Sequence, residues 1–129
     1  MHRIETDKAP KAIGPYSQGV MTEELVFVSG QLPIHPPEGK IVDFTIEGQT
    51  KQVLDNVEAI LKAAGLSFHD VIRAEVFLQD MRDFQKVNAI YAERFNGPIK
   101  PARQAVQVAR LPMDALVEIS CIAVRKRGK

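Results

Sequence analysis

Residues 45–65 read TIEGQTKQVLDNVEAILKAAG, and they carry the clearest helical pattern in the chain. Apolar side chains recur there every three or four residues, so they form one stripe along a helix. Thr45 is of a type that caps helix starts, and Gly65 stands where a helix end favours a left-handed backbone. We therefore predict an amphipathic helix that packs on a sheet. Its stripe comprises Ile46, Val53, Leu54, Val57, Ile60, Leu61 and Ala64.

A second amphipathic helix is predicted further along the chain. Asp80 can cap its start, and the Asn-Gly-Pro string at residues 96–98 stops it. One face of this helix is apolar and should also pack on a sheet. That face is formed by Phe84, Val87, Tyr91 and Phe95.

Strand patterns surround the two helices, at residues 25–29, 71–78, 102–108 and 116–124. The predicted order is β-β-α-β-α-β-β. Helices with such connections most economically cover one face of a mixed sheet, so the fold class is α+β. At 129 residues the chain has the length of a single domain, spanning 1–129.

The sheet face that the helices leave uncovered is predicted to be apolar. In residues 71–78, alternation places Ile72, Ala74, Val76 and Leu78 on one face, and Arg73, Glu75 and Phe77 on the other. A wider set of strand residues is too apolar for every second face to lie in water. This indicates a partner, most simply further copies of the chain. The set comprises Val26, Val28, Phe77, Ala105, Val117 and Ile119.

Composition limits the classes of function. The chain is 45% hydrophobic and 26% charged, with a net charge of +1, which favours neither nucleic acid nor membrane as a partner. No apolar run approaches the roughly 20 residues of a membrane helix, and the N-terminus does not read as a signal peptide. The lone Cys121 rules out an internal disulfide and suits a reducing compartment. We expect a cytoplasmic protein.

Two short strings stand out beside the strands. GPYSQ at residues 14–18 is either a Gly-Pro turn with a surface tyrosine or part of a site. VSGQLP at residues 28–33 is a strand that ends in a bend of small residues, which exposes backbone groups. A plain strand terminus explains the second string about equally well.

The third string is the most specific. PARQAV at residues 101–106 leads through ARLP to VEI at residues 117–119. Arg103 and Glu118 stand within apolar strands, where a lone charge is costly, so each needs a partner. They are either a structural ion pair or a site. In a site, Arg103 would clamp a carboxylate through two hydrogen bonds and Glu118 would handle water.

Together with the DNV and AAGL strings of the first helix, these motifs resemble the RidA family of reactive intermediate deaminases, formerly YjgF. The resemblance covers almost the whole chain in the expected order. It implies a chorismate-mutase-like fold and a homotrimer whose sheets form a central barrel. The active sites would then lie in clefts between neighbouring subunits.

The resemblance also implies roles for individual residues. Arg103 matches the family's carboxylate-binding arginine, Glu118 its water-orienting glutamate and Tyr16 the tyrosine of the cleft. Three further residues match pocket positions: Ser29, Gly30 and Asn88. Ala105 replaces a cysteine common in the family, so only its backbone N–H could help to bind substrate. Cys121 lies on the strand face opposite Glu118 and is expected to pack in the core.

The implied reaction is the hydrolysis of 2-aminoacrylate and 2-aminocrotonate, through their imine tautomers, to 2-keto acids and ammonia. The imine carbon is already electrophilic, so we expect neither a metal nor an organic cofactor. His2, His35 and His69 lack the spacing of a metal site.

Two other functions stay open. Ribonuclease or translation-inhibitor activity has been attached to the family, and the basic residues 125–129 are the one feature that favours it. A short basic terminus is usually a solvated end, and no aromatic stacking platform accompanies it. The other is a trimer that binds ligands without turnover, which would not need Glu118.

Overall fold

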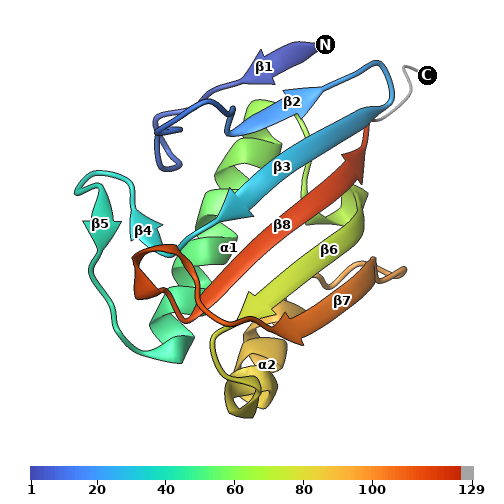
Figure 1. The fold of residues 1–129 in the computed structure, drawn as a ribbon. Coiled ribbons are helices and arrows are strands. Elements are labelled where there is room, and N and C mark those ends of the chain that lie inside the picture. Colours follow the sequence, from blue (N-terminus) through green and yellow to red (C-terminus); the bar gives the residue numbers. More distant parts are fainter. Residues whose placement is uncertain (126–129) are drawn as a thin grey trace.

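The computed structural model describes residues 1–125, and its main element is a six-stranded sheet with two helices on one face (Figure 1). The sheet order is β1-β2-β3-β8-β6-β7. Its strands are β1 (His2–Ile4), β2 (Gly19–Met21), β3 (Leu25–Gln31), β6 (Val71–Leu78), β7 (Ala102–Gln107) and β8 (Val117–Val124). The helices are α1 (Ile46–Ala63) and α2 (Phe84–Arg94). β6 and β7 are parallel and the other neighbours antiparallel, which confirms the predicted mixed α+β sheet.

The N-terminal half holds more strands than predicted. β1 and β2 precede β3, and a separate hairpin of β4 (Ile34–His35) and β5 (Lys40–Ile41) follows it. The sequence indicated only two strands before the first helix. Strands of two or three residues are too short to show alternation, so the pattern could not reveal them. Among residues 1–125, no helix is both long and apolar enough to span a membrane.

The predicted cap of the first helix is confirmed, whereas that of the second is displaced. The Thr45 hydroxyl accepts a hydrogen bond from the Gly48 N–H at 3.0 Å, and Gly65 takes a left-handed φ of 79° after α1. Asp80 instead caps a 3-10 turn, Met81–Asp83, by accepting from the Arg82 N–H at 2.9 Å. Helix α2 therefore begins only at Phe84, one short turn later than the cap implied.

Two buried side-chain amides on α1, those of Gln49 and Asn56, hold the end of β3 and the start of β8 in place. The Gln49 Oε1 accepts from the Leu116 N–H at 2.8 Å, just before β8. The Asn56 Nδ2 donates to the carbonyls of Leu32 at 3.0 Å and Ile34 at 2.9 Å, just after β3. Since a buried amide without partners is costly, these contacts tie the end of β3 and the start of β8 to the rigid helix.

The prediction for the uncovered face was wrong in its residues. Val26, Val28, Val117 and Ile119 are at most 3% exposed and belong to the core under the helices, and Ala105 packs against that core. Of the named set, only Phe77 lies on the open face, because strand alternation turns every second residue away from the core. The open face instead carries Phe27, Phe77, Val106, Ile122, Ser29, Glu75, Glu118 and Ser120.

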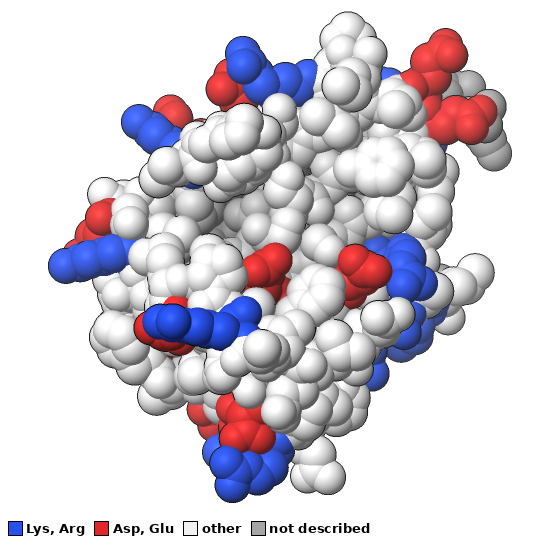
Figure 2. All heavy atoms as spheres, viewed as in Figure 1, with Lys and Arg blue, Asp and Glu red and all other residues white. Residues whose placement is uncertain are grey.

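One residue of β6 also departs from the predicted alternation. Ile72 is 46% exposed, whereas Val71 is buried. The pairing of β6 with β8 shifts register between Val71 and Arg73, and such a bulge moves a side chain from one face to the other. Figure 2, viewed from the open side, shows mostly uncharged atoms over the strands, with most Lys and Arg side chains at the rim.

Candidate active site

Glu118 and Gly30 meet where β3 stops pairing regularly with β8. The register of the two strands shifts between Val28 and Gln31, so Ser29 and Gly30 lie in an irregular segment. A side chain at Gly30 would collide with the Glu118 carboxylate, whose Cδ lies 3.0 Å from an ideal Cβ position. Glycine thus leaves the space that the carboxylate occupies.

The carboxyl group of Glu118 is half-buried. Burial raises the pKa of Glu118 above its ordinary value of 4.5, because a desolvated carboxylate loses hydration. A carboxyl group with a raised pKa is a stronger base, which suits it to take a proton from water.

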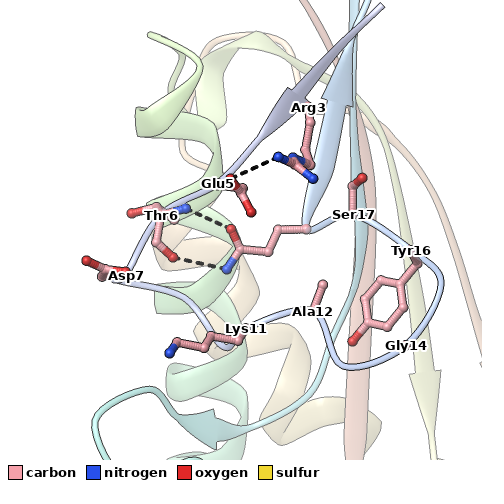
Figure 3. A pocket seen from close by; sticks show the side chains of 10 residues that line it. Arg3, Glu5, Thr6, Asp7, Lys11, Ala12, Gly14, Tyr16 and Ser17 are labelled. Carbon is pink, nitrogen blue, oxygen red and sulfur yellow. Dashed lines mark hydrogen bonds and ion pairs between the residues drawn. The ribbon is translucent and has the colours of Figure 1, made fainter.

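Ser29 near the end of β3 attaches to the loop before β2, which carries Tyr16. The Ser29 hydroxyl donates to the Ser17 carbonyl at 2.6 Å, and the Ser29 N–H donates to the Gln18 carbonyl at 3.0 Å. Tyr16 is 54% exposed, and its hydroxyl accepts from the Ile13 N–H at 3.3 Å. Figure 3 shows the ring of Tyr16 within this loop, beside Ala12 and Gly14.

Buried Gln18 holds the loop in place through hydrogen bonds to Thr6 and Pro10. Its Nε2 donates to the carbonyls of Thr6 at 3.0 Å and Pro10 at 2.8 Å, and its Oε1 accepts from the Thr6 N–H at 2.8 Å. The glutamine of the GPYSQ string therefore has a structural task that the sequence did not assign to it. Tyr16, Ser29, Gly30 and Glu118 form one half of the candidate site.

Arg103, on the edge strand β7, forms the other half with α2. Its Nη1 donates to the Asn88 Oδ1 at 2.6 Å. Its Cζ lies 4.8 Å from the ring centroid of Tyr91 and 5.3 Å from that of Phe84. Stacking on aromatic faces restrains a planar guanidinium while its remaining N–H groups stay available. The sequence placed Asn88 in the pocket but did not identify Phe84 and Tyr91 as its support.

Tyr91 is itself firmly anchored. Its ring stacks on Phe95 with centroids 4.2 Å apart, and its hydroxyl is buried with no hydrogen-bond partner among residues 1–125. Burial raises the pKa of Tyr91 to about 12, while nearby Arg103 acts in the opposite direction. A hollow of about 350 Å³ borders this half-site between Asn88, Arg103 and Lys100.

The two half-sites lie on opposite faces of the sheet. Arg103 pairs with fully buried Ala74 and turns toward α2. Glu118 pairs with Phe77 and alternates with core residues, so it faces the open side. The structural Arg103–Glu118 pair that the sequence left open therefore does not form within one chain.

Ala105 lies two residues after Arg103 on β7 and shares its face of the sheet. Ala105 is half-buried beside the core on β7, and Cys121 is buried in the core on the face opposite Glu118, as expected. Burial raises the pKa of the Cys121 thiol to about 12. His35 contacts Glu38 and His69 contacts Asn96, each at 3.0 Å. Within residues 1–125, no group of three or more His, Cys, Asp or Glu side chains could hold a metal ion.

The tail that favoured RNA binding is described only at its first residue. The Arg125 Nη1 donates to the Thr22 carbonyl at 2.6 Å, and its N–H donates to the Glu24 carbonyl. Residues 126–129 of that tail lie outside the described part of the chain.

Fold and site together define an α+β protein whose candidate site has an arginine half and a glutamate half on opposite faces of one sheet. Residues 6–125 match the family described as Endoribonuclease L-PSP. The chain belongs to this family, which includes the YjgF, RutC and RidA proteins.

Similar proteins extend over nearly the full length of the chain. A RutC family protein of Pyrococcus horikoshii is 54% identical, over 95% of this chain and 97% of the relative. The 2-iminobutanoate/2-iminopropanoate deaminase of Escherichia coli is 46% identical, over 95% and 97% of the two chains. The crystal structure of E. coli TdcF with bound serine superposes with a TM-score of 0.93, at 46% identity, and covers 98% of this chain and 100% of that one.

Proposed function

We propose that this protein is a hydrolase that converts 2-imino acids, and the 2-amino-enoic acids that tautomerise to them, into 2-keto acids and ammonia. The observation that carries the proposal is the half-buried Glu118, whose raised pKa makes it a suitable base. The preoriented Arg103 supports it, because a guanidinium fork matches a carboxylate. The name of the E. coli relative supports the same chemistry.

The reaction balances without further reagents. Arg103 binds the substrate carboxylate and holds the imine carbon beside a water molecule. Glu118 takes a proton from that water as its oxygen bonds to the carbon, and passes this proton to the imine nitrogen, which gives the carbinolamine. Glu118 then takes the hydroxyl proton and delivers it to the nitrogen as the C–N bond breaks, so ammonia leaves and the hydroxyl oxygen becomes the keto oxygen. Proton transfer of this kind contributes roughly 10²- to 10⁴-fold in rate.

The complete site requires two copies of the chain. Arg103 and Glu118 face opposite sides of one sheet, so a substrate that touches both must lie between neighbouring subunits. Arg103 is exposed on an edge strand, where a neighbour has access to it. The open face, on which Phe27 and Phe77 lie among polar side chains, offers a surface for that neighbour. We infer a homotrimer, as the family resemblance implied.

The test generates 2-aminocrotonate from threonine with a threonine dehydratase and follows the appearance of 2-ketobutyrate. We expect catalytic amounts of the protein to accelerate it and Glu118→Gln to abolish most of the acceleration. A parent protein that binds 2-ketobutyrate but does not accelerate its formation would be a binding trimer. Because the family description names an endoribonuclease, a labelled RNA is incubated in parallel; cleavage without deamination would overturn the proposal.

A further inference from the structure

The turn before β8 adopts an unusual backbone for its residues. Met113 and Asp114 have φ angles of 59° and 54°, in the left-handed region that favours glycine. Arg110 holds the turn by donating through Nε to Asp114 Oδ1 at 2.7 Å and through Nη2 to Oδ2 at 3.1 Å. Met113 is left 53% exposed, although it is wholly apolar.

Met113 borders a hollow that reaches the Glu118 half of the site. The hollow measures about 180 Å³, and Tyr16 and Gly30 from the Glu118 half of the site line it. Gly30 is also the residue against which the Glu118 carboxylate lies, so this one residue borders both the hollow and the proposed base. Apolar residues form much of its lining: Pro10, Ile13, Leu32, Ile34, Pro112 and Met113.

The polar groups of the hollow are mostly engaged elsewhere. The Gln18 amide is used by the segment at residues 6–10, and the Gln31 Nε2 donates to the Ser29 carbonyl at 3.1 Å. Lys11 lines the hollow with an exposed side chain. The walls therefore offer a binding surface for hydrocarbon, with one cation beside it.

We propose that this hollow binds the side chain of the imino acid and that Met113 determines specificity for apolar side chains longer than ethyl. The inference rests on the proposed function, since the substrate must have its imine carbon beside Glu118. Roughly 10–15 Å³ of such space already admits one water molecule, so a hollow of about 180 Å³ has room for several methylenes. Each buried methylene increases kcat/KM by roughly fourfold. An unbranched thioether adapts to side chains of different shape.

The test compares imines made in situ by an amino-acid oxidase, with catalase present, from alanine, leucine and glutamate. We expect the parent protein to prefer the leucine-derived imine over the alanine-derived one by roughly 10-fold or more. Met113→Gln keeps length without adding charge, and should lower that preference by roughly 5- to 10-fold. The matched variant Met113→Leu should retain it. Equal melting temperatures of the variants exclude a loss of folding.

Three results would overturn the assignment. The first is a Met113→Gln effect that is equal for the alanine- and leucine-derived imines. The second is a parent preference for the alanine-derived imine. The third is a preference for the glutamate-derived imine, which would mean that the hollow binds an acidic side chain through Lys11.

Product binding distinguishes a failure of this inference from a failure of the proposed function. Pyruvate and 4-methyl-2-oxopentanoate are stable, and their affinities are measured by calorimetry without turnover. Tighter binding of the branched acid that Met113→Gln abolishes would support the subsite even if no imine were hydrolysed. Equal affinities of the parent protein for the two acids would overturn it.

Discussion

Arg103 and Glu118 point to opposite faces of one sheet. The guanidinium lies over Tyr91 and bonds to Asn88 on the helix-covered side, while the carboxylate lies against Gly30 on the open side. If both act on one substrate, each site takes its arginine from one subunit and its glutamate from another. This relationship makes the proposed mechanism testable by mixing subunits.

Mixing two inactive variants should restore activity. In a trimer assembled from equal amounts of Arg103→Ala and Glu118→Gln chains, about one interface in four combines an intact arginine with an intact glutamate. We therefore expect about a quarter of the parent activity after the two are refolded together. The control is the same mixture without exchange of subunits. Activity no greater than that of the separate variants would place the whole site within one chain.

Arg103→Lys should lower kcat/KM by roughly 10- to 100-fold while the protein stays folded. Lysine keeps the charge, but it loses the planar fork that binds two carboxylate oxygens and stacks on Tyr91. The side chain is exposed, so its replacement leaves no hole in the core. Deamination kinetics and melting temperature are measured together. A well-folded variant with full activity would refute the carboxylate clamp.

The pH dependence of kcat/KM should have an acid limb set by Glu118. The proposed base must be ionised, and burial raises its pKa, so activity should fall as the pH drops through a value above 4.5. Glu118→Gln should lose roughly 100-fold or more in rate and should also lose this limb. Rates are corrected for spontaneous hydrolysis at each pH. An identical acid limb in the variant would mean that ionisation of the substrate, and not of Glu118, causes it.

Gly30→Ala should impair catalysis more than folding. The added methyl group would occupy the position of the Glu118 carboxylate, and the backbone of Gly30 is not left-handed, so alanine fits it. The Glu118 side chain is flexible and can move away from the added methyl group. We therefore expect a loss of roughly 10-fold in kcat/KM with little change in melting temperature. Combining Gly30→Ala with Glu118→Gln should add no further loss. Additive losses would mean that Gly30 acts independently of Glu118.

The thiol of Cys121 should be inert in the native protein. It is buried on the core side of β8, and burial raises its pKa from 9.0 to about 12, so almost no thiolate exists at neutral pH. A thiol-specific chromogenic reagent should label it only after denaturant is added. Rapid labelling of the folded protein would show that β8 opens readily.

Local chemistry determined the elements that the sequence predicted well. The helix after Thr45 and the strand at residues 71–78 have strong periodic patterns, and the structure has them as α1 and β6. Short strands such as β1 and β4 gave no pattern, because two or three residues do not show a period. The motifs identified Arg103, Glu118, Tyr16 and their neighbours as candidates, and the roles of these residues stay predictions.

The sequence by itself determined which chemical groups the protein carries and on which strands they lie. Only the tertiary structure decided which groups meet. The pairing of Ala74 with Arg103 and of Phe77 with Glu118 separates the two charges by a sheet, and alternation along a single strand cannot reveal this. The aromatic support of Arg103 and the contact of Gly30 with Glu118 likewise join residues from different elements. A strand pattern fixes faces within its own strand, whereas register between strands is set by packing of the whole sheet on its helices.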